Sequence, residues 1–161
     1  MLLNNASDTF IGPTTFNNTL EAERIFSENF FGIFIFLRET IRYIKRVGRG
    51  RIIHILWADD VLERIGGAVY NASNLALQNL GYHLSQEITF DDITINNISL
   101  SCTDGAGMAS NWHKKSLTEK KVGQATLNQT DIGEIVHGLN FFISNEARNI
   151  INQTGCFGEG H

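Results

Sequence analysis

Proline and cysteine are scarce in this sequence, with one proline and two cysteines. Pro13 keeps the polar segment 10–18 out of a helix, because proline lacks a backbone N–H and clashes with the preceding turn. Cys102 and Cys156 have neither CxxC spacing nor enough partners for a disulfide framework. We therefore expect both to be free, buried thiols in a reducing compartment.

A long apolar run and an excess of positive charge are also missing. The richest apolar run, 30–37, is far shorter than the roughly 20 residues that cross a bilayer. The apolar start, 1–3, is too short for a secretion signal. There are 13 Lys and Arg against 17 Asp and Glu, which gives a net charge of −4 and no basic stripe for nucleic acid. These absences predict a cytoplasmic protein with no membrane or nucleic-acid partner.

The apolar patterns that are present predict one domain, 1–161, in which strands and helices alternate. The run 51–57 contains three isoleucines and is typical of a strand buried on both faces. Further strands are expected at 1–6, 93–100 and 153–157, and helices at 21–46, 68–86 and 131–143. This alternation predicts an α/β fold, with a parallel sheet that carries helices on both faces.

The helix expected at 21–46 has a marked aromatic stripe. Thr19 is the expected N-cap, and apolar residues then recur at helical spacing: Phe26, Phe30, Phe34, Leu37, Ile41 and Ile44. Either the protein's own core or a second subunit covers this stripe. For the helix at 131–143 we expect Thr130 and Asp131 to cap the first turn, with Glu134 completing a capping box.

Several short motifs occur along the chain in a fixed order. The turn 4–6 reads NNA, Asn29 lies early in the first long helix, and Tyr70 opens the second, followed by Asn74 four positions on. The strand 93–96 reads ITIN. As an ordered set, these motifs resemble the short-chain dehydrogenase/reductase family, with its NNAG turn, its helical asparagine, its YxxxK motif and its I-x-V-N strand. The resemblance implies a Rossmann-like sheet.

The spacing of Asn29, Trp57 and Tyr70 is similar to that of 3-oxoacyl-carrier-protein reductases. A finer likeness, carried by residues 5–8, 52–54 and 63–64, is to pteridine reductases of the dihydromonapterin type. Both subgroups remain open as interpretations.

The resemblance assigns roles to four positions. Tyr70 stands where the family keeps its proton donor, and Asn29 stands where an asparagine holds a relay water. Asn74 replaces the lysine that lowers the pKa of the tyrosine, and Trp57 replaces the serine that orients the substrate oxygen. A neighbour such as Asp59 or Ser73 could take the place of that serine. A free tyrosine has a pKa of about 10, so it needs such tuning near neutral pH. Tyr70 is thus either a general acid or a structural residue.

The family binds NAD(P), and here the resemblance assigns cofactor contacts to Asn5, Ala6 and Tyr70. No Gly-rich turn follows an early strand, although helix N-terminal N–H groups at such a turn hold the pyrophosphate. The chain is thus expected to begin at the family's fourth strand, without the N-terminal third. The strand ending at Leu3 would then be an open edge that another chain, a symmetry mate or a rearranged N-terminus covers.

Two functions follow from the resemblance. The first is a catalytically degenerate family member, a pseudoenzyme that is inactive alone and acts as a binding or assembly subunit. Its homo- or hetero-oligomer would form through helices 21–46 and 68–86. The alternative is an NAD(P)-dependent oxidoreductase that reduces a carbonyl or pteridine substrate, with its nucleotide-binding part supplied elsewhere. The five histidines lack metal-ligand spacing, so no metal site is expected.

Overall fold

The fold is described from a computed structural model, which covers residues 1–8, 12–57, 67–88, 92–100 and 131–157. In chain order the elements are β1 (Leu2–Asn4), the 3₁₀ turn η1 (Thr14–Phe16), α1 (Thr19–Phe26), the π-helical segment η2 (Ser27–Gly32), α2 (Ile33–Val47), β2 (Arg49–Trp57), α3 (Ala68–Glu87), β3 (Asp92–Leu100), α5 (Ile132–Ile143) and β4 (Thr154–Phe157). The predicted alternation of strand and helix is confirmed.

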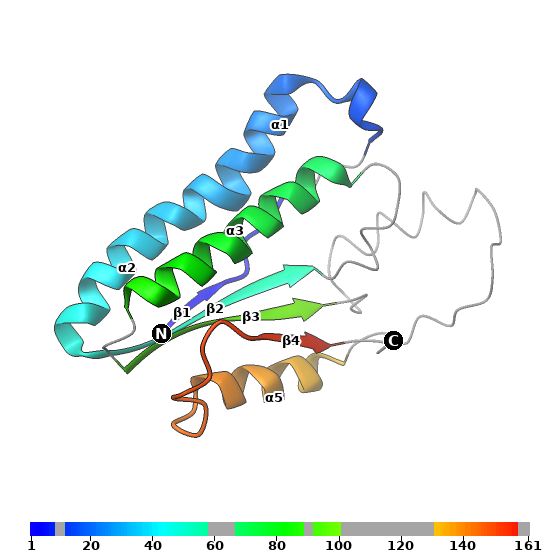
Figure 1. Cartoon of the computed structure of the whole chain (residues 1–161). Helices are drawn as coiled ribbons and strands as arrows, with labels where there is room; N and C mark the ends of the chain where they lie inside the picture. Colours follow the sequence, from blue (N-terminus) through cyan, green and yellow to red (C-terminus); the bar gives the residue numbers. More distant parts are fainter. Residues whose placement is uncertain (9–11, 58–66, 89–91, 101–130, 158–161) are drawn as a thin grey trace.

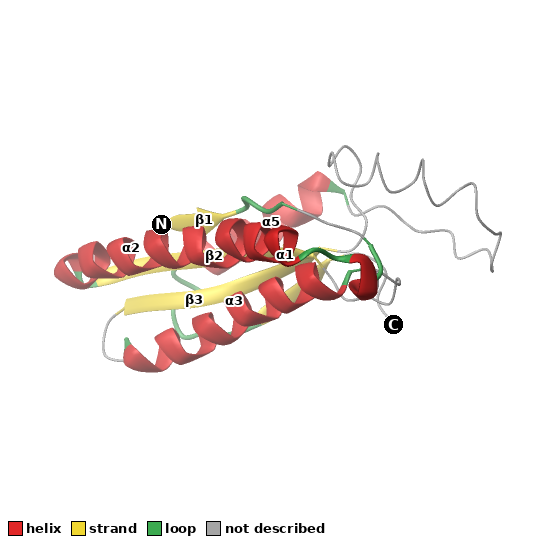
Figure 2. Cartoon of the chain, turned by 90° about the horizontal axis from the view of Figure 1, so that it is seen from above, coloured by secondary structure: helices red, strands yellow, loops and turns green. Residues whose placement is uncertain are grey.

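The four strands form one parallel sheet in the order β1-β2-β3-β4. Helices α1, α2 and α3 cover one face, and α5 covers the other (Figure 1). The view from above shows α3 running beside α1 and α2 in the same layer (Figure 2). The predicted α/β class with helices on both faces is therefore confirmed, and the carboxyl ends of all strands lie along one edge.

Two apolar clusters fill the space on either side of the sheet. On the α2 and α3 side, Ile52 and Ile95 pack with Leu37 and Leu77. On the α5 side, Ile53 and Ile98 pack with Phe142. Ile52 and Ile53 separate in this way because successive side chains of a strand point to opposite faces. A strand buried on both faces explains the nearly continuous apolar run that predicted β2.

The long first helix differs from its prediction in two respects. The N-cap is Asn18, whose side chain accepts a hydrogen bond from the Leu20 N–H at 2.6 Å, so Thr19 is the first helical residue and the predicted cap is wrong by one position. The helix also passes through η2, where hydrogen bonds reach five residues instead of four. Phe34 is 36% exposed instead of lying on the core stripe, whereas Leu37 and Ile44 of the same stripe are buried as predicted.

Two predictions near the C-terminal end are also corrected. Asp131 is the N-cap of α5, but its side chain makes no capping hydrogen bond, and only its backbone carbonyl accepts from Glu134 N–H. Thr130 lies outside the described residues. Cys156 is free and exposed, not buried, because it lies on the edge strand β4; Cys102 also lies outside the described residues.

β1 is the edge strand opposite β4, and within the described residues it pairs with β2 alone. Leu3 on this strand is 38% exposed. The cover expected for this edge stays a prediction. None of the described helices is long and apolar enough to cross a bilayer.

Candidate functional site

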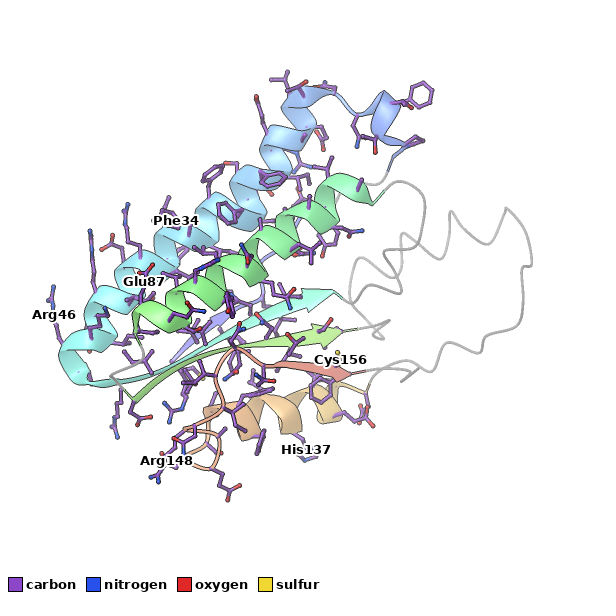
Figure 3. All side chains as sticks on the ribbon, in the orientation of Figure 1. Phe34, Arg46, Glu87, His137, Arg148 and Cys156 are labelled. Carbon is purple, nitrogen blue, oxygen red and sulfur yellow. The ribbon has the colours of Figure 1, made fainter. Side chains whose placement is uncertain are left out.

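The candidate site lies at the carboxyl edge of the sheet, where three separate elements meet. The loop after β1 contributes Ser7 and Asp8, η2 contributes Asn29, and the first turns of α3 contribute Tyr70 and Asn74. The basic end of α2 lies far from this site, since Figure 3 shows Arg46 and Glu87 at the other end of the helix layer. Parallel strands place polar loop residues together at this edge.

Asn29 is buried and joins two of these elements. Its Oδ1 accepts a hydrogen bond from Asp8 N–H at 2.7 Å, and its Nδ2 donates to the Asp8 carbonyl at 2.8 Å. The same Nδ2 donates to the Ser73 hydroxyl at 3.1 Å. The π-helical turn around Asn29 presents this amide inward, and such turns are frequent at functional sites. The structure thus places Asn29 in the site, where its side-chain amide makes its hydrogen bonds with Asp8 and Ser73 of the same chain.

Tyr70 is buried at 5% exposure in the first turn of α3. Its hydroxyl oxygen accepts a hydrogen bond from the Ser7 hydroxyl at 3.2 Å. Burial raises the pKa of the Tyr70 phenol, while the Ser7 hydroxyl that donates to it and the nearby neutral amide of Asn74 oppose that rise. Within the described residues, the groups that shift this pKa include no cation. Tyr70 is therefore a protonated phenol at neutral pH and a poor base.

Asn74 faces the interior one turn after Tyr70 and is 8% exposed. Its Nδ2 has no hydrogen-bond partner among the described residues. The amide carries no charge, so it stabilises a neighbouring phenolate far less than an ammonium group does. Ser73, the residue before it, donates to the Tyr70 carbonyl at 2.6 Å and links Tyr70 to Asn29.

The other predicted site residues are placed less completely. Trp57 is the last residue of β2, and its backbone pairs with Leu100 of β3. The side chain of Trp57 lies outside the described residues. Asp59, a neighbour that could replace the serine, also lies outside them. Asn5 and Ala6 follow β1 at the site edge and are exposed. The cofactor role assigned to them stays a prediction.

One contact residue, Ser7, is absent from the sequence-based site, and Ser73 enters it only as a neighbour that could replace the serine. Ser73 is three positions after Tyr70, on the same helix face, and this spacing is a signal that helical geometry could have supplied. Ser7 stands where the NNAG turn has glycine. Its contact depends on the path of the loop after β1, which the local sequence does not encode.

Asn96, which belongs to the ITIN strand, lies in the middle of β3 and bonds the segment that precedes β4. Its Oδ1 accepts from Gln153 N–H at 2.9 Å, and its Nδ2 donates to the Ile150 carbonyl at 2.8 Å. This buried amide fixes the segment that leads into β4. Its role is structural.

The described residues fit a nicotinamide nucleotide poorly. The unpartnered Asn74 amide could offer a nucleotide one neutral hydrogen bond. Among the described residues, the groups that shift the pKa of Tyr70 include no cation. In the described part of the chain, no three His, Cys, Asp or Glu side chains gather as metal ligands.

Comparison with known proteins places these features in context. Residues 1–117 match the family model described as short chain dehydrogenase. Curated relatives include the 3-alpha-(or 20-beta)-hydroxysteroid dehydrogenases of Mycobacterium bovis and Mycobacterium tuberculosis. Each is 29% identical over 98 residues, which is 61% of this chain and 38% of the relative. The chain thus spans well under half the length of these relatives.

Solved structures share the fold over 96% of this chain. One is a point variant of actinorhodin polyketide ketoreductase with NADPH, with a TM-score of 0.84 and 18% identity. Another is 4-hydroxyisoleucine dehydrogenase complexed with NADH and succinate, with a TM-score of 0.72 and 21% identity. This chain covers 64% of each of those two chains.

Proposed function

The chain belongs to the short-chain dehydrogenase family, and we propose that it is a member that does not transfer hydride and instead acts as an associating subunit. The observation that carries this proposal is the environment of Tyr70. Asn74 stands where the family's lysine would supply a positive charge, and the phenol is buried with a raised pKa. The proposed loss of chemistry rests on this missing charge.

The physical argument concerns the phenolate that proton transfer leaves behind. Burial of a charged phenolate costs free energy because the charge loses its hydration. Without a nearby cation, only neutral hydrogen-bond donors offset that cost. Ser7 and Asn74 are such neutral donors. Tyr70 therefore holds its proton at neutral pH, and the proton transfer that accompanies carbonyl reduction is disfavoured.

The outer face of the helix layer supports the associating role. Phe36 and Tyr43 are seven residues apart on α2 and share one face, and Leu75 and Tyr82 share a face of α3 in the same way. All four are exposed, as are Phe31 and Ile35. Exposed apolar side chains gathered on neighbouring helices are typical of protein–protein contact surfaces. We propose that helices 21–46 and 68–86 pair with the same helices of a second copy.

The association is tested by light scattering coupled to size exclusion. The proposal expects a mass of twice 18.0 kDa, and it expects Phe36→Asp to return the chain to a monomer because a carboxylate would be buried in the contact. Phe16→Asp is the matched control, since Phe16 is 84% exposed in the 3₁₀ turn outside these helices. A wild-type monomer at high concentration would contradict the proposal.

A second candidate is an NAD(P)-dependent reductase of a carbonyl or pteridine substrate, completed by a nucleotide-binding part from elsewhere. The hydrogen bond that Ser7 donates to Tyr70 favours it, because this bond leaves the phenol proton free for another acceptor. Two of the solved structures that share the fold hold NADPH and NADH. The two candidates differ in whether the chain takes a nicotinamide nucleotide.

A further inference from the structure

The contact between Ser7 and Tyr70 joins residues 63 positions apart. Ser7 lies in the loop after β1, and Tyr70 lies in the first turn of α3, so the contact ties the carboxyl edge of the sheet to the helix layer. The family's NNAG turn has glycine at the position of Ser7 and therefore offers no side chain there. The hydroxyl of Ser7 thus makes a contact that a turn with glycine at this position could not make.

The backbone next to Ser7 is held by the hydrogen bonds and the ion pair of Asp8. Asp8, the next residue, has its N–H and its carbonyl both bonded to Asn29, at 2.7 and 2.8 Å. The Asp8 carboxylate also pairs with the Arg24 guanidinium. The backbone beside Ser7 is therefore fixed from two sides, and its side chain reaches Tyr70 from a rigid support.

The Tyr70 side of the contact is fixed by the same asparagine. Asn29 donates to Ser73, and Ser73 donates to the Tyr70 carbonyl at 2.6 Å. Both ends of the contact thus lead back to Asn29 through short hydrogen bonds. A closed circuit of this kind orders its members more strongly than an isolated pair.

From this geometry we infer that Ser7 is a positioning residue, which directs the Tyr70 hydroxyl toward the β1 loop and takes one hydrogen-bonding position on its oxygen. The inference deepens the proposed function, on which it rests for the assignment of Tyr70 as the former proton donor. The neutral Ser7 hydroxyl contacts the phenol in a chain that has Asn74 and Trp57 at the positions of the family's lysine and serine. It steadies the phenol without supplying the charge that proton release would need. Tyr70 consequently remains a hydrogen-bond donor.

Tyrosine labelled with ¹³C at Cζ provides the test, because this carbon responds to hydrogen bonding and ionisation of its own phenol. The chain has three tyrosines, and Tyr70→Phe assigns the site resonance. We expect Ser7→Ala to shift the Tyr70 resonance at neutral pH and to raise its titration midpoint, while Tyr43 and Tyr82 stay unchanged. Ser7→Thr should restore the wild-type resonance. Ser85→Ala is the matched control, since Ser85 donates only to the Tyr82 carbonyl.

A double-variant comparison covers the case in which alkaline pH unfolds the protein before Tyr70 titrates. Ser7→Ala and Tyr70→Phe should each lower the urea midpoint, and the combined variant should lower it by less than the sum of the two losses. Additive losses together with an unmoved Tyr70 resonance in Ser7→Ala would overturn the inference. Neither readout needs a cofactor, and all urea midpoints are compared at one protein concentration because association affects them, so the proposed function can fail without this inference failing.

Discussion

Asn29 and Ser73 are 44 positions apart, and the Asn29 side-chain amide donates to the Ser73 hydroxyl at 3.1 Å in the buried space between η2 and α3. The same amide group holds both backbone polar groups of Asp8. One side chain therefore joins the loop after β1, the π-helical turn and α3. Its position is one that the family resemblance also singled out.

The first prediction concerns this asparagine. Asn29→Ala removes the partner of Asp8 N–H, of the Asp8 carbonyl and of Ser73. Each group left unsatisfied in the interior costs about 1–3 kcal/mol, and solvent can reach part of the loop, so we expect a loss of about 2–4 kcal/mol in the free energy of unfolding. Urea denaturation measures it. Asn149→Ala, on an exposed side chain, should change the same quantity by less than about 0.5 kcal/mol. Equal effects of the two substitutions would show that the Asn29 hydrogen bonds contribute little.

The second prediction is a pH dependence that originates in β2. His54 is fully buried, its Nδ1 accepts from the Asn4 side chain at 3.0 Å, and burial lowers its pKa from 6.5 to about 4. Above pH 6.5 the imidazole is neutral in both the folded and the unfolded chain. As the pH falls from 6.5 toward 4, only the unfolded chain takes up the proton. The free energy of unfolding therefore decreases, by about 2 kcal/mol between pH 7 and pH 5.

Urea denaturation at pH 7 and pH 5 tests this sign. His54→Gln should remove most of the difference between the two pH values, whatever its own effect on stability. His83→Gln should keep the difference, because His83 is exposed on α3. If His54→Gln retains the full wild-type difference, the dependence arises from other groups.

The third prediction concerns the charge missing near Tyr70. Asn74→Lys places an ammonium group beside the phenol, and a nearby cation favours the phenolate, so the Tyr70 pKa should fall by about 1–3 units. Asn74→Met, of similar length and without charge, should not lower it. The ¹³Cζ titration of Tyr70 in both variants gives the comparison. A Tyr70 titration in Asn74→Lys that matches the wild type would show that position 74 does not act on this phenol.

Sequence patterns predicted the sheet well because its information is local. The isoleucines at positions 52, 53, 95 and 98 form β-type apolar runs, and the loops between runs carry turn residues. The π-helical turn around Asn29 was not predicted, because one extra residue in a turn leaves the composition unchanged. The cap at Asn18 instead of Thr19 is a choice between two capable neighbours.

The site was predicted in part. Asn29 and Tyr70 were singled out from motif order, and the structure links them through Ser73. The contact between Ser7 and Tyr70 could not be predicted, since it depends on how the loop after β1 crosses the end of the sheet. The missing hydrogen-bond partner of the Asn74 Nδ2 among the described residues is likewise a property of packing. It could not be predicted because it depends on which side chains surround the amide in the folded chain.

The central claim, that the chain does not carry hydride transfer, is tested most directly by titrating the purified protein with NADPH and then NADH. Nicotinamide fluorescence reports the binding. We expect the fluorescence of the mixture to equal the sum of the fluorescence of free protein and of free nucleotide, up to millimolar nucleotide. A saturable rise in nicotinamide fluorescence that Tyr70→Phe or Asn74→Met weakens would contradict it and favour the reductase.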